Sequence, residues 1–288
     1  MAVRFGTIAL VGRPNAGKSS LLNALVGERV AAVSSRPQTT RNRICGIVTT
    51  ETLQAVLVDT PGLHEGWNVL NKRMVAVAEA ALDSCDTVAW IVDCTRPFDA
   101  EFAGRLAPRK PVVVLNKIDL VDKLALLPLI QLYAAAGEVV PVSAAKRDGL
   151  PQLMAVWEAR LPEGERLYSP DQYTDQTEKA LCAEIIREQV FHRTGEEVPY
   201  CSAVEIEGFN ETEREAGKVH IHARIVVEKP SQKAILIGKG GAMVKQIGTE
   251  SRSRIERLLG CRVRLDLFIA VEKDWTSNPN KLREFGYD

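Results

Sequence analysis

A lysine and a serine end a glycine-rich octet near the start of the chain, Gly12-Arg13-Pro14-Asn15-Ala16-Gly17-Lys18-Ser19. The spacing G-x-x-x-x-G-K-S is that of a P-loop, in which backbone N–H groups surround a polyphosphate. We expect Lys18 to reach the β- and γ-phosphates and the Ser19 hydroxyl to bind Mg²⁺. The octet therefore predicts a nucleotide site. Its expected contacts are Gly12, Asn15, Ala16, Gly17, Lys18, Ser19 and Ser20.

Two further segments supply groups that can complete a magnesium site. The polar, proline-interrupted stretch 30–43 predicts a long loop in which a threonine closes over the γ-phosphate. We choose Thr40 and keep Thr39 as the alternative. Asp59 ends an apolar run and should hold Mg²⁺ through water, while the Gly62 N–H meets the γ-phosphate. The expected metal ligands are Ser19, Thr40 and Asp59, and the expected catalytic contacts are Lys18, Thr40 and Gly62.

Two later motifs have the chemistry to select guanine. In Asn-Lys-Ile-Asp, we expect a buried Asp119 carboxylate to accept hydrogen bonds from the N1–H and the exocyclic amine of guanine. Adenine lacks that pair of donors and would leave the charge unpaired. Asn116 is expected to read the other edge of the base, and the Lys117 stem to lie over its plane. The segment Ser143-Ala144-Ala145 is expected to offer the Ala144 N–H to guanine O6, so the predicted ligand is GTP.

A third kind of chemistry is indicated by the turn Gly238-Lys239-Gly240-Gly241, which joins an apolar helix to a helix with basic residues. A G-x-x-G turn lets a single-stranded backbone lie against helix N-termini, with Lys239 facing a phosphate and an apolar groove taking the bases. Positions 228–264 hold 9 basic and 3 acidic residues, and 171–215 hold 4 basic and 12 acidic. This excess favours RNA over a plain helix–helix turn. The expected RNA contacts are Lys233, Gly238, Lys239, Gly240, Gly241, Lys245 and Arg252, with Arg254 and Arg257 as further phosphate candidates.

Alternating strands and helices must position these residues. The nucleotide motifs stand at or just beyond the C-terminal ends of apolar runs, and carboxyl ends of parallel strands share one edge of an open α/β sheet. The motifs should therefore form one site. We predict a P-loop NTPase domain with a doubly wound, mostly parallel α/β sheet over 1–165 and a linker over 166–173. A smaller α+β type II KH domain, in the order αββααβ, should occupy 174–288.

Composition argues against several other classes. The 288 residues are 45% hydrophobic and 26% charged with zero net charge, as in ordinary soluble proteins. No apolar run approaches the roughly 18 residues of a spanning helix, and no signal peptide is indicated, so we expect a cytoplasmic protein. Six scattered cysteines without a C-x-x-C pair argue against zinc and disulfides. His220 and His222 share a strand face without a third ligand, so we expect no metal there.

Together these motifs resemble those of the Era family, bacterial Ras-like GTPases with a C-terminal KH domain in the TrmE–Era–EngA–Septin-like class. The resemblance covers nearly the whole chain and extends to the segments 37–41, 184–188, 198–200 and 275–287. It implies a GTPase that works with GTP, GDP and Mg²⁺, binds the 3′ end of 16S ribosomal RNA and assists assembly of the small ribosomal subunit. A peripheral contact with the inner membrane is reported for the family, and nothing in this sequence shows it. We expect a monomer and no DNA partner.

Two positions bear on the rate of hydrolysis. A Ras-type enzyme has glutamine after the D-x-x-G glycine to orient the attacking water, and here that residue is Leu63. We therefore expect slow intrinsic turnover, with the water held by backbone groups or a partner. In relatives, the position of Asn15 helps to bind a potassium ion beside the phosphates, so K⁺ should speed turnover. His64 follows Leu63, and the presence of a histidine there is explained as well by local packing as by a role in the chemistry.

Two other functions stay open at this stage. The first is an RNA-binding scaffold in which GTP only stabilises the fold. Multiple turnover that changes on adding RNA would separate the switch from that scaffold. The second, a metabolic P-loop kinase, is disfavoured because Asn116 and Asp119 are suited to guanine and no phosphoacceptor pocket is indicated.

Overall fold

Apolar runs without alternation need burial on both faces, and a mostly parallel sheet gives them that environment. The strands are β1 (Val3–Val11), β2 (Ile44–Thr49), β3 (Leu53–Asp59), β4 (Thr87–Asp93), β5 (Val112–Asn116), β6 (Glu138–Pro141) and β7 (Glu163–Gly164). Their order is β2-β3-β1-β4-β5-β6, with β7 added beside the start of β1. β2 and β7 run antiparallel to their neighbours, and the other pairs are parallel.

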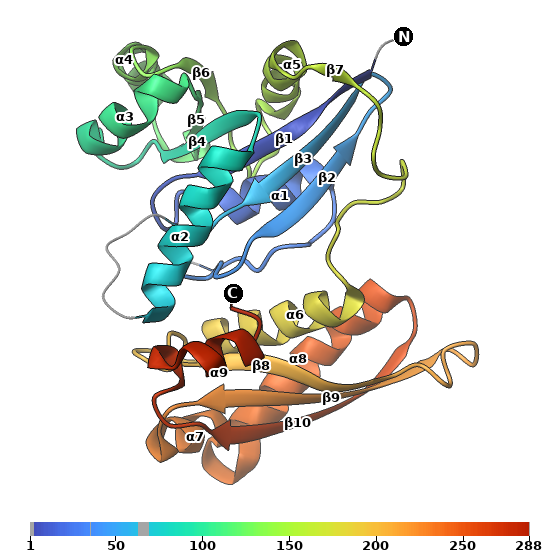
Figure 1. Ribbon diagram of the computed structural model, residues 1–288. Helices are drawn as coiled ribbons and strands as arrows, with labels where there is room; N and C mark the ends of the chain where they lie inside the picture. Colours follow the sequence, from blue (N-terminus) through green and yellow to red (C-terminus); the bar gives the residue numbers. More distant parts are fainter. Residues whose placement is uncertain (1–2, 35, 63–68, 288) are drawn as a thin grey trace. The chain divides into compact units, whose positions relative to one another are not determined.

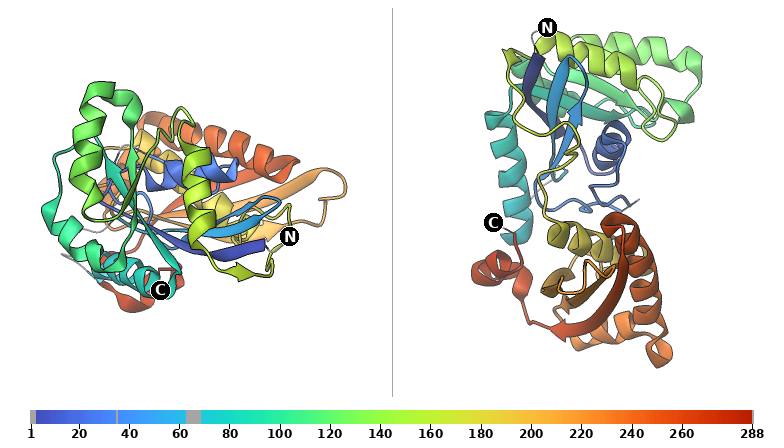
Figure 2. Two further views of the ribbon diagram at one scale, coloured as in Figure 1. Left: turned by 90° about the horizontal axis from the view of Figure 1, so that it is seen from above. Right: turned by 90° about the vertical axis from the view of Figure 1, so that its right-hand side faces the viewer.

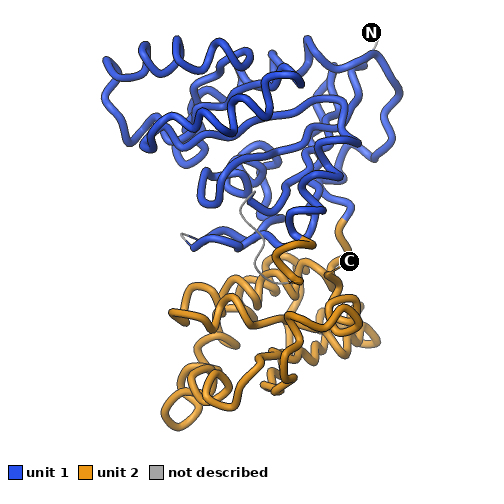
Figure 3. Tube along the Cα trace, turned by 60° about the vertical axis from the view of Figure 1, so that its left-hand side comes forward, with its two compact units in different colours: residues 1–65, 74–175 blue, residues 66–73, 176–288 orange. Residues whose placement is uncertain are grey.

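The computed structural model describes residues 3–34, 36–62 and 69–287 (Figure 1). The chain divides into two units (Figure 3). The first is Met1–Glu65 with Met74–Asp175, and the second is Gly66–Arg73 with Gln176–Asp288. Within the described ranges, no helix is both long and apolar enough to cross a lipid bilayer.

Helices cover both faces of the large sheet (Figures 1 and 2). α1 (Lys18–Val26) and α5 (Leu150–Arg160) lie on one face, and α2 (Val69–Ser84), α3 (Ala100–Leu106) and α4 (Lys123–Ala134) on the other. Trp90 of β4 is 2% exposed and packs in the core with Leu82, Leu106 and Tyr133 of the second group. This burial fixes the strand ends at which the nucleotide motifs stand.

The second unit is a three-stranded sheet with helices packed on one face. The elements follow in the order α6 (Glu178–Arg193), β8 (Ala203–Asn210), β9 (Lys218–Val227), α7 (Pro230–Ile237), α8 (Ala242–Leu259) and β10 (Arg262–Val271). This confirms the predicted αββααβ order. Alternate residues of β9, such as Val219 and Ile221, pack against Ile186, Leu236 and Ile255 of the three helices.

A short C-terminal segment completes this unit. It contains η4 (Trp275–Ser277) and α9 (Pro279–Glu284). The indole of Trp275 is fully buried, stacks on Tyr287 with ring centroids 5.8 Å apart, and donates its Nε1–H to Cys201 O at 2.9 Å. The segment is therefore part of the second core.

The residues after β7 pack along the first sheet. The Ile47 N–H of β2 donates to Tyr173 O at 2.9 Å, and the Thr174 hydroxyl donates to Cys45 O at 2.6 Å. Further back, Gln54 Oε1 accepts the backbone N–H of Leu167 at 2.8 Å. β2 is the outermost strand of its sheet, so this segment occupies its free side.

Candidate functional site

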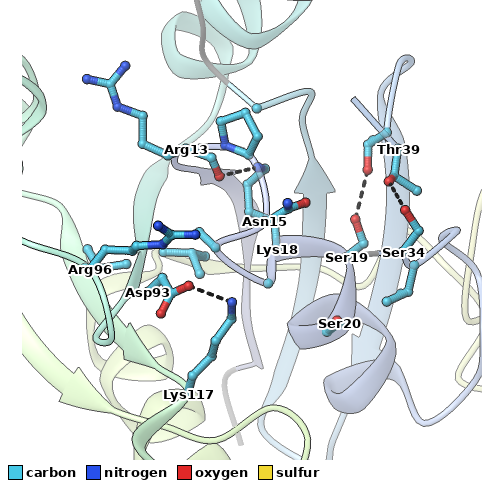
Figure 4. A pocket seen from close by; sticks show the side chains of 18 of the residues that line it. Arg13, Asn15, Lys18, Ser19, Ser20, Ser34, Thr39, Asp93, Arg96 and Lys117 are labelled. Atoms are coloured by element: carbon cyan, nitrogen blue, oxygen red, sulfur yellow. Dashed lines mark hydrogen bonds and ion pairs between the residues drawn. The ribbon is translucent and has the colours of Figure 1, made fainter. Parts of the chain in front are cut away.

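The P-loop turn is shaped by close contacts that only glycine permits. A Cβ on Gly12 would lie 2.3 Å from Ile91 O, and a Cβ on Gly17 would lie 2.2 Å from Asn116 Nδ2. Gly17 also has φ 97°, in the left-handed region, and is the N-cap of α1. The turn thus presents the N-terminus of α1 to a cavity of about 670 Å³ (Figure 4), a favourable place for an anion.

Lys18 is buried at the start of α1 and lines this cavity. Its Nζ donates to Gly12 O at 3.2 Å and to Arg13 O at 3.3 Å. Burial lowers the pKa of Lys18, and the nearby Asp59 carboxylate opposes that shift. The ammonium is therefore held at the centre of the P-loop with incomplete charge compensation, as a polyphosphate-binding residue should be.

We expect phosphate binding at Lys18 to take up a proton at alkaline pH. A bound polyphosphate favours the ammonium and raises the pKa that burial lowers in the free protein. Between the two pKa values, affinity must fall as pH rises. Calorimetry with inorganic tripolyphosphate at alkaline pH, in buffers of different ionisation enthalpy, measures the uptake after correction for the protons that tripolyphosphate itself exchanges. Binding without proton uptake up to pH 10 would contradict the expectation.

Three oxygen groups converge beside the P-loop. The Ser19 hydroxyl donates to Asp59 Oδ2 at 2.6 Å, and the hydroxyls of Ser19 and Thr40 are 2.8 Å apart. Thr40 Oγ1 also lies 3.1 Å from Asp59 Oδ2. Two hydroxyls and one carboxylate are hard donors that fit Mg²⁺, which keeps several waters and takes few protein ligands. These three residues would hold the ion, and its charge would neutralise that of the phosphates.

Thr39, the alternative candidate, lies outside this group. Its hydroxyl donates to Arg36 O at 2.8 Å and lies 2.8 Å from the Ser34 hydroxyl (Figure 4). Thr39 therefore holds the loop together, and Thr40 is the threonine that reaches Ser19 and Asp59.

Removal of the Thr40 hydroxyl should weaken magnesium binding far more than removal of the neighbouring one. Since outer groups at metal sites already affect metal affinity by about 10- to 100-fold, we expect Thr40→Ala to raise the Mg²⁺ concentration for half-maximal GTP hydrolysis at least tenfold. Thr39→Ala is a matched control, because Thr39 and Thr40 are 8% and 6% exposed. A magnesium titration of hydrolysis measures both, and equal midpoints would contradict the assignment.

Asn116 connects three motifs rather than facing a ligand. The residue is 2% exposed, its Nδ2 donates to Ala16 O at 2.9 Å, and its Oδ1 accepts the Ala144 N–H at 3.1 Å. The expectation that Asn116 reads the base edge and that Ala144 offers its N–H to guanine is therefore not met in this geometry. The Ala145 N–H, which has no hydrogen bond to another described residue, is the remaining donor at this segment.

Lys117 lines the cavity, and Asp119 follows it two residues later in the same motif. Asp119 is exposed, not buried as expected, and its Oδ1 accepts the Ser143 hydroxyl at 2.5 Å. Lys117 Nζ lies 2.6 Å from Asp93 Oδ2. Burial opposes the shift, but hydrogen bonds from Lys117 and Thr95 hold the pKa of Asp93 below its ordinary value. The Asp119 carboxylate is thus oriented by Ser143, and the Lys117 ammonium is fixed by Asp93.

Gly62 lies against the P-loop, since a Cβ there would be 2.8 Å from the Pro14 nitrogen. The next two residues, Leu63 and His64, are outside the described residues. Ser20 lines the cavity next to Ser19. Sequence reasoning missed Asp93, Arg96 and Asp99, which also line the cavity; their position after the apolar run of β4 was the available signal.

The second candidate site is the turn between α7 and α8. Gly238 has φ 70° and ψ 176°, and a Cβ on it would lie 2.7 Å from Met243 Cβ, so only glycine lets the two helices approach. Gly240 has φ 59°, and added Cβ atoms on Gly240 and Gly241 would meet nothing within 4 Å. The outer part of the turn is thus open to a ligand.

A groove of about 280 Å³ lies beside this turn, between α8 and β10. Lys245 and Arg252 supply charge to its lining, and Val244, Leu265 and Leu267 supply apolar surface. Lys239 is exposed and Lys233 is half-buried. Exposed cations beside an apolar groove suit a single-stranded nucleic acid.

Arg254 is not available for this groove, although the sequence made it a phosphate candidate. Its Nη1 lies 3.2 Å from a carboxylate oxygen of Glu188, and that side chain is 2% exposed. Removing Arg254 would take an ion-pair partner from this buried carboxylate, so the role of Arg254 is structural. Arg257 donates its Nε–H to Ser253 O at 3.3 Å on its own helix.

Comparison with known proteins covers both units. The family model described as 50S ribosome-binding GTPase matches residues 7–117, and the KH domain model matches residues 197–276. The chain is 44% identical over 294 residues to the GTPase Era of Geobacter metallireducens, covering 99% of this chain and 98% of that protein. It is also 44% identical over 290 residues to the GTPase Era of Lactobacillus delbrueckii subsp. bulgaricus, covering 98% and 96%.

Two solved structures match over 99% of both chains with 36% identity and a TM-score of 0.93. One is a tyrosine-to-alanine variant of Aquifex aeolicus Era bound to GDP and AlF4⁻. The other is Era in complex with MgGDPNP and nucleotides 1506–1542 of 16S ribosomal RNA.

Proposed function

The chain belongs to the Era family of GTPases, and on that premise we propose that it is a GTP-dependent switch for ribosomal RNA. It binds and hydrolyses GTP, binds the single-stranded 3′ end of 16S ribosomal RNA and assists assembly of the small ribosomal subunit. The observation that carries the proposal is the likeness to the Era complex with MgGDPNP and 16S nucleotides. This chain has both a phosphate-binding turn and a basic, apolar groove in corresponding domains.

The nucleotide chemistry follows from the residues of the first unit. Lys18 and the N–H groups of the turn bind the phosphates, and Ser19, Thr40 and Asp59 hold Mg²⁺. GTP binding orders the loop of Thr40 and the backbone at Gly62, because both meet the γ-phosphate. Hydrolysis removes those contacts, and a difference between the two states is what a switch requires.

The two activities belong to two successive parts of the chain. We assign nucleotide chemistry to residues 1–165 and RNA binding to 174–288, with 166–173 between them. In the second part, Lys239 and the turn from Gly238 to Gly241 bind phosphates of the RNA. The groove with Lys245 and Arg252 takes the bases. The protein acts in the cytoplasm, and a peripheral contact with the inner membrane is an implication of the family that no described feature supports.

The test of this proposal is multiple-turnover GTP hydrolysis with and without a short RNA that matches the 3′ end of 16S ribosomal RNA. We expect slow intrinsic turnover that the RNA changes, and faster turnover in K⁺ than in Na⁺ if Asn15 helps to bind potassium. RNA binding without turnover would support the scaffold instead. An RNA of the same length and scrambled sequence is the control.

A further inference from the structure

The loop between β4 and α3, residues 93–99, lies along one side of the nucleotide cavity and is held at both ends. At its start, the Asp93 carboxylate pairs with Lys117 and accepts the Thr95 N–H at 3.0 Å and its hydroxyl at 2.6 Å. The Arg96 N–H donates to Asp93 O at 3.0 Å. The loop is thus closed into a turn against a residue of the Asn-Lys-Ile-Asp motif.

The other end of the loop is tied to the P-loop itself. Asp99 Oδ2 lies 2.6 Å from Arg13 Nε, and its Oδ1 caps α3 by accepting the Phe102 N–H at 3.0 Å. The hydrogen bond from Arg13 holds the pKa of Asp99 below its ordinary value. Pro97, between the two ends, restricts the preceding residue to extended angles. Arg96 is therefore carried on a preorganised loop whose anchors flank the phosphate-binding turn.

Arg96 is a cation of this region whose side chain has no partner among the residues that the structure describes. It is exposed, lines the cavity, and its guanidinium forms no hydrogen bond or ion pair with the residues that the structure describes. By contrast, Arg13 pairs with Asp99, and Lys117 pairs with Asp93. In Figure 4, the Arg96 side chain extends toward the P-loop from the side opposite Ser34 and Thr39.

We propose that Arg96 is a phosphate-binding residue of the GTP site that strengthens the binding of GTP more than that of GDP. Its guanidinium donates hydrogen bonds to phosphate oxygens, the planar pairing for which arginine is suited. GTP carries one more ionised phosphate than GDP, so a cation at the rim of the cavity favours it. The Thr40 loop and Arg96 then approach the nucleotide from opposite sides. This inference rests on the proposed function.

The test compares the affinities of fluorescent GDP and GMPPNP for the full-length protein and for Arg96→Ala, Arg96→Lys and Lys123→Ala. We expect Arg96→Ala to lower the affinity for GMPPNP about tenfold and the affinity for GDP about threefold. Hydrogen bonds between charged groups are strong, but the exposure of this side chain limits their effect. Arg96→Lys should give an intermediate loss. Lys123→Ala removes one exposed charge outside the cavity lining and should change neither affinity. The loss should shrink at high salt.

Three results would overturn the inference. They are unchanged affinities in Arg96→Ala, an equal loss for both nucleotides, or an equal loss in Lys123→Ala. The thermal midpoint of each variant checks folding, and it should stay at the wild-type value because Arg96 has no partner to lose among the described residues. A wild-type protein that binds neither nucleotide would refute the proposed function itself, so the two failures are distinguishable.

Discussion

Replacing Asp119 with asparagine is expected to change the nucleotide preference of the protein from GTP to xanthosine triphosphate. In the proposed site the carboxylate accepts two hydrogen bonds from guanine. An asparagine amide would instead present a donor that clashes with the guanine amine and suits the xanthine oxygen. Sites built on such hydrogen bonds reject the wrong partner strongly, so GTP affinity should fall on the order of 10³-fold. The Ser143 hydroxyl donates to Asp119 Oδ1 at 2.5 Å and so fixes the orientation of the carboxylate. We therefore expect selectivity for guanine although Asp119 is exposed.

The control for this change is Asp122→Asn, three residues further on. Asp122 is the exposed N-cap of α4, where its Oδ1 accepts the Leu124 N–H at 2.9 Å. Asparagine caps a helix as well as aspartate does, so the same charge is removed without loss of structure. Competition between GTP and xanthosine triphosphate for a fluorescent analogue measures the outcome. An Asp119→Asn protein that prefers GTP would contradict the assignment.

Replacing Gly240 with aspartate should weaken RNA binding strongly and leave nucleotide binding intact. Gly240 lies in the open part of the turn between α7 and α8, at φ 59°, where an added side chain meets no atom within 4 Å. Aspartate tolerates left-handed angles, so folding should survive. The new carboxylate would repel the phosphates that Lys239 is expected to bind. We expect RNA affinity to fall about 100-fold, from lost contacts together with repulsion.

Gly217→Asp is the matched control for that variant. Gly217 lies between β8 and β9 at φ 76°, and a Cβ there also meets nothing within 4 Å. Both variants therefore add one negative charge and one side chain at a left-handed position of the same domain. They differ in whether that position lies in the proposed RNA-binding turn. Fluorescence anisotropy with the 16S-matching RNA measures both affinities. Gly240→Asp should show nearly the whole loss of about 100-fold, and Gly217→Asp should bind like the wild type. Equal affinities of the two variants would mean that the RNA does not bind at the turn of Gly240.

Long apolar runs made the fold predictable, because runs with motifs at their ends allow few arrangements other than a parallel sheet. The predicted P-loop sheet followed by a KH domain is confirmed. Of the motifs that were expected to meet at one edge, the P-loop, the Thr40 loop, Gly62 and Lys117 line one cavity, and Asn116 joins Ala144 to the P-loop by hydrogen bonds. Local sequence was enough for this, since each motif is fixed by the strand directly before it.

Contacts between distant residues could not be predicted in the same way. The role of Asn116 depends on Ala16, 100 positions earlier in the chain, and on Ala144. The pairing of Arg254 with Glu188 joins α8 to α6 and removes from the RNA groove a cation that composition alone would include. Periodicity says which face of a helix is buried, but it does not say which polar groups pair across the core.

The contact of Tyr173 and Thr174 with β2 has a consequence for biosynthesis. β2 is the outermost strand of its sheet and is made early, whereas these two residues emerge only after every other strand of that sheet. Until then, the outer N–H and C=O groups of β2 can pair with another nascent chain. The segment that leads to the KH domain thus also protects the newly made GTPase domain. A product truncated before Tyr173 should aggregate through this strand.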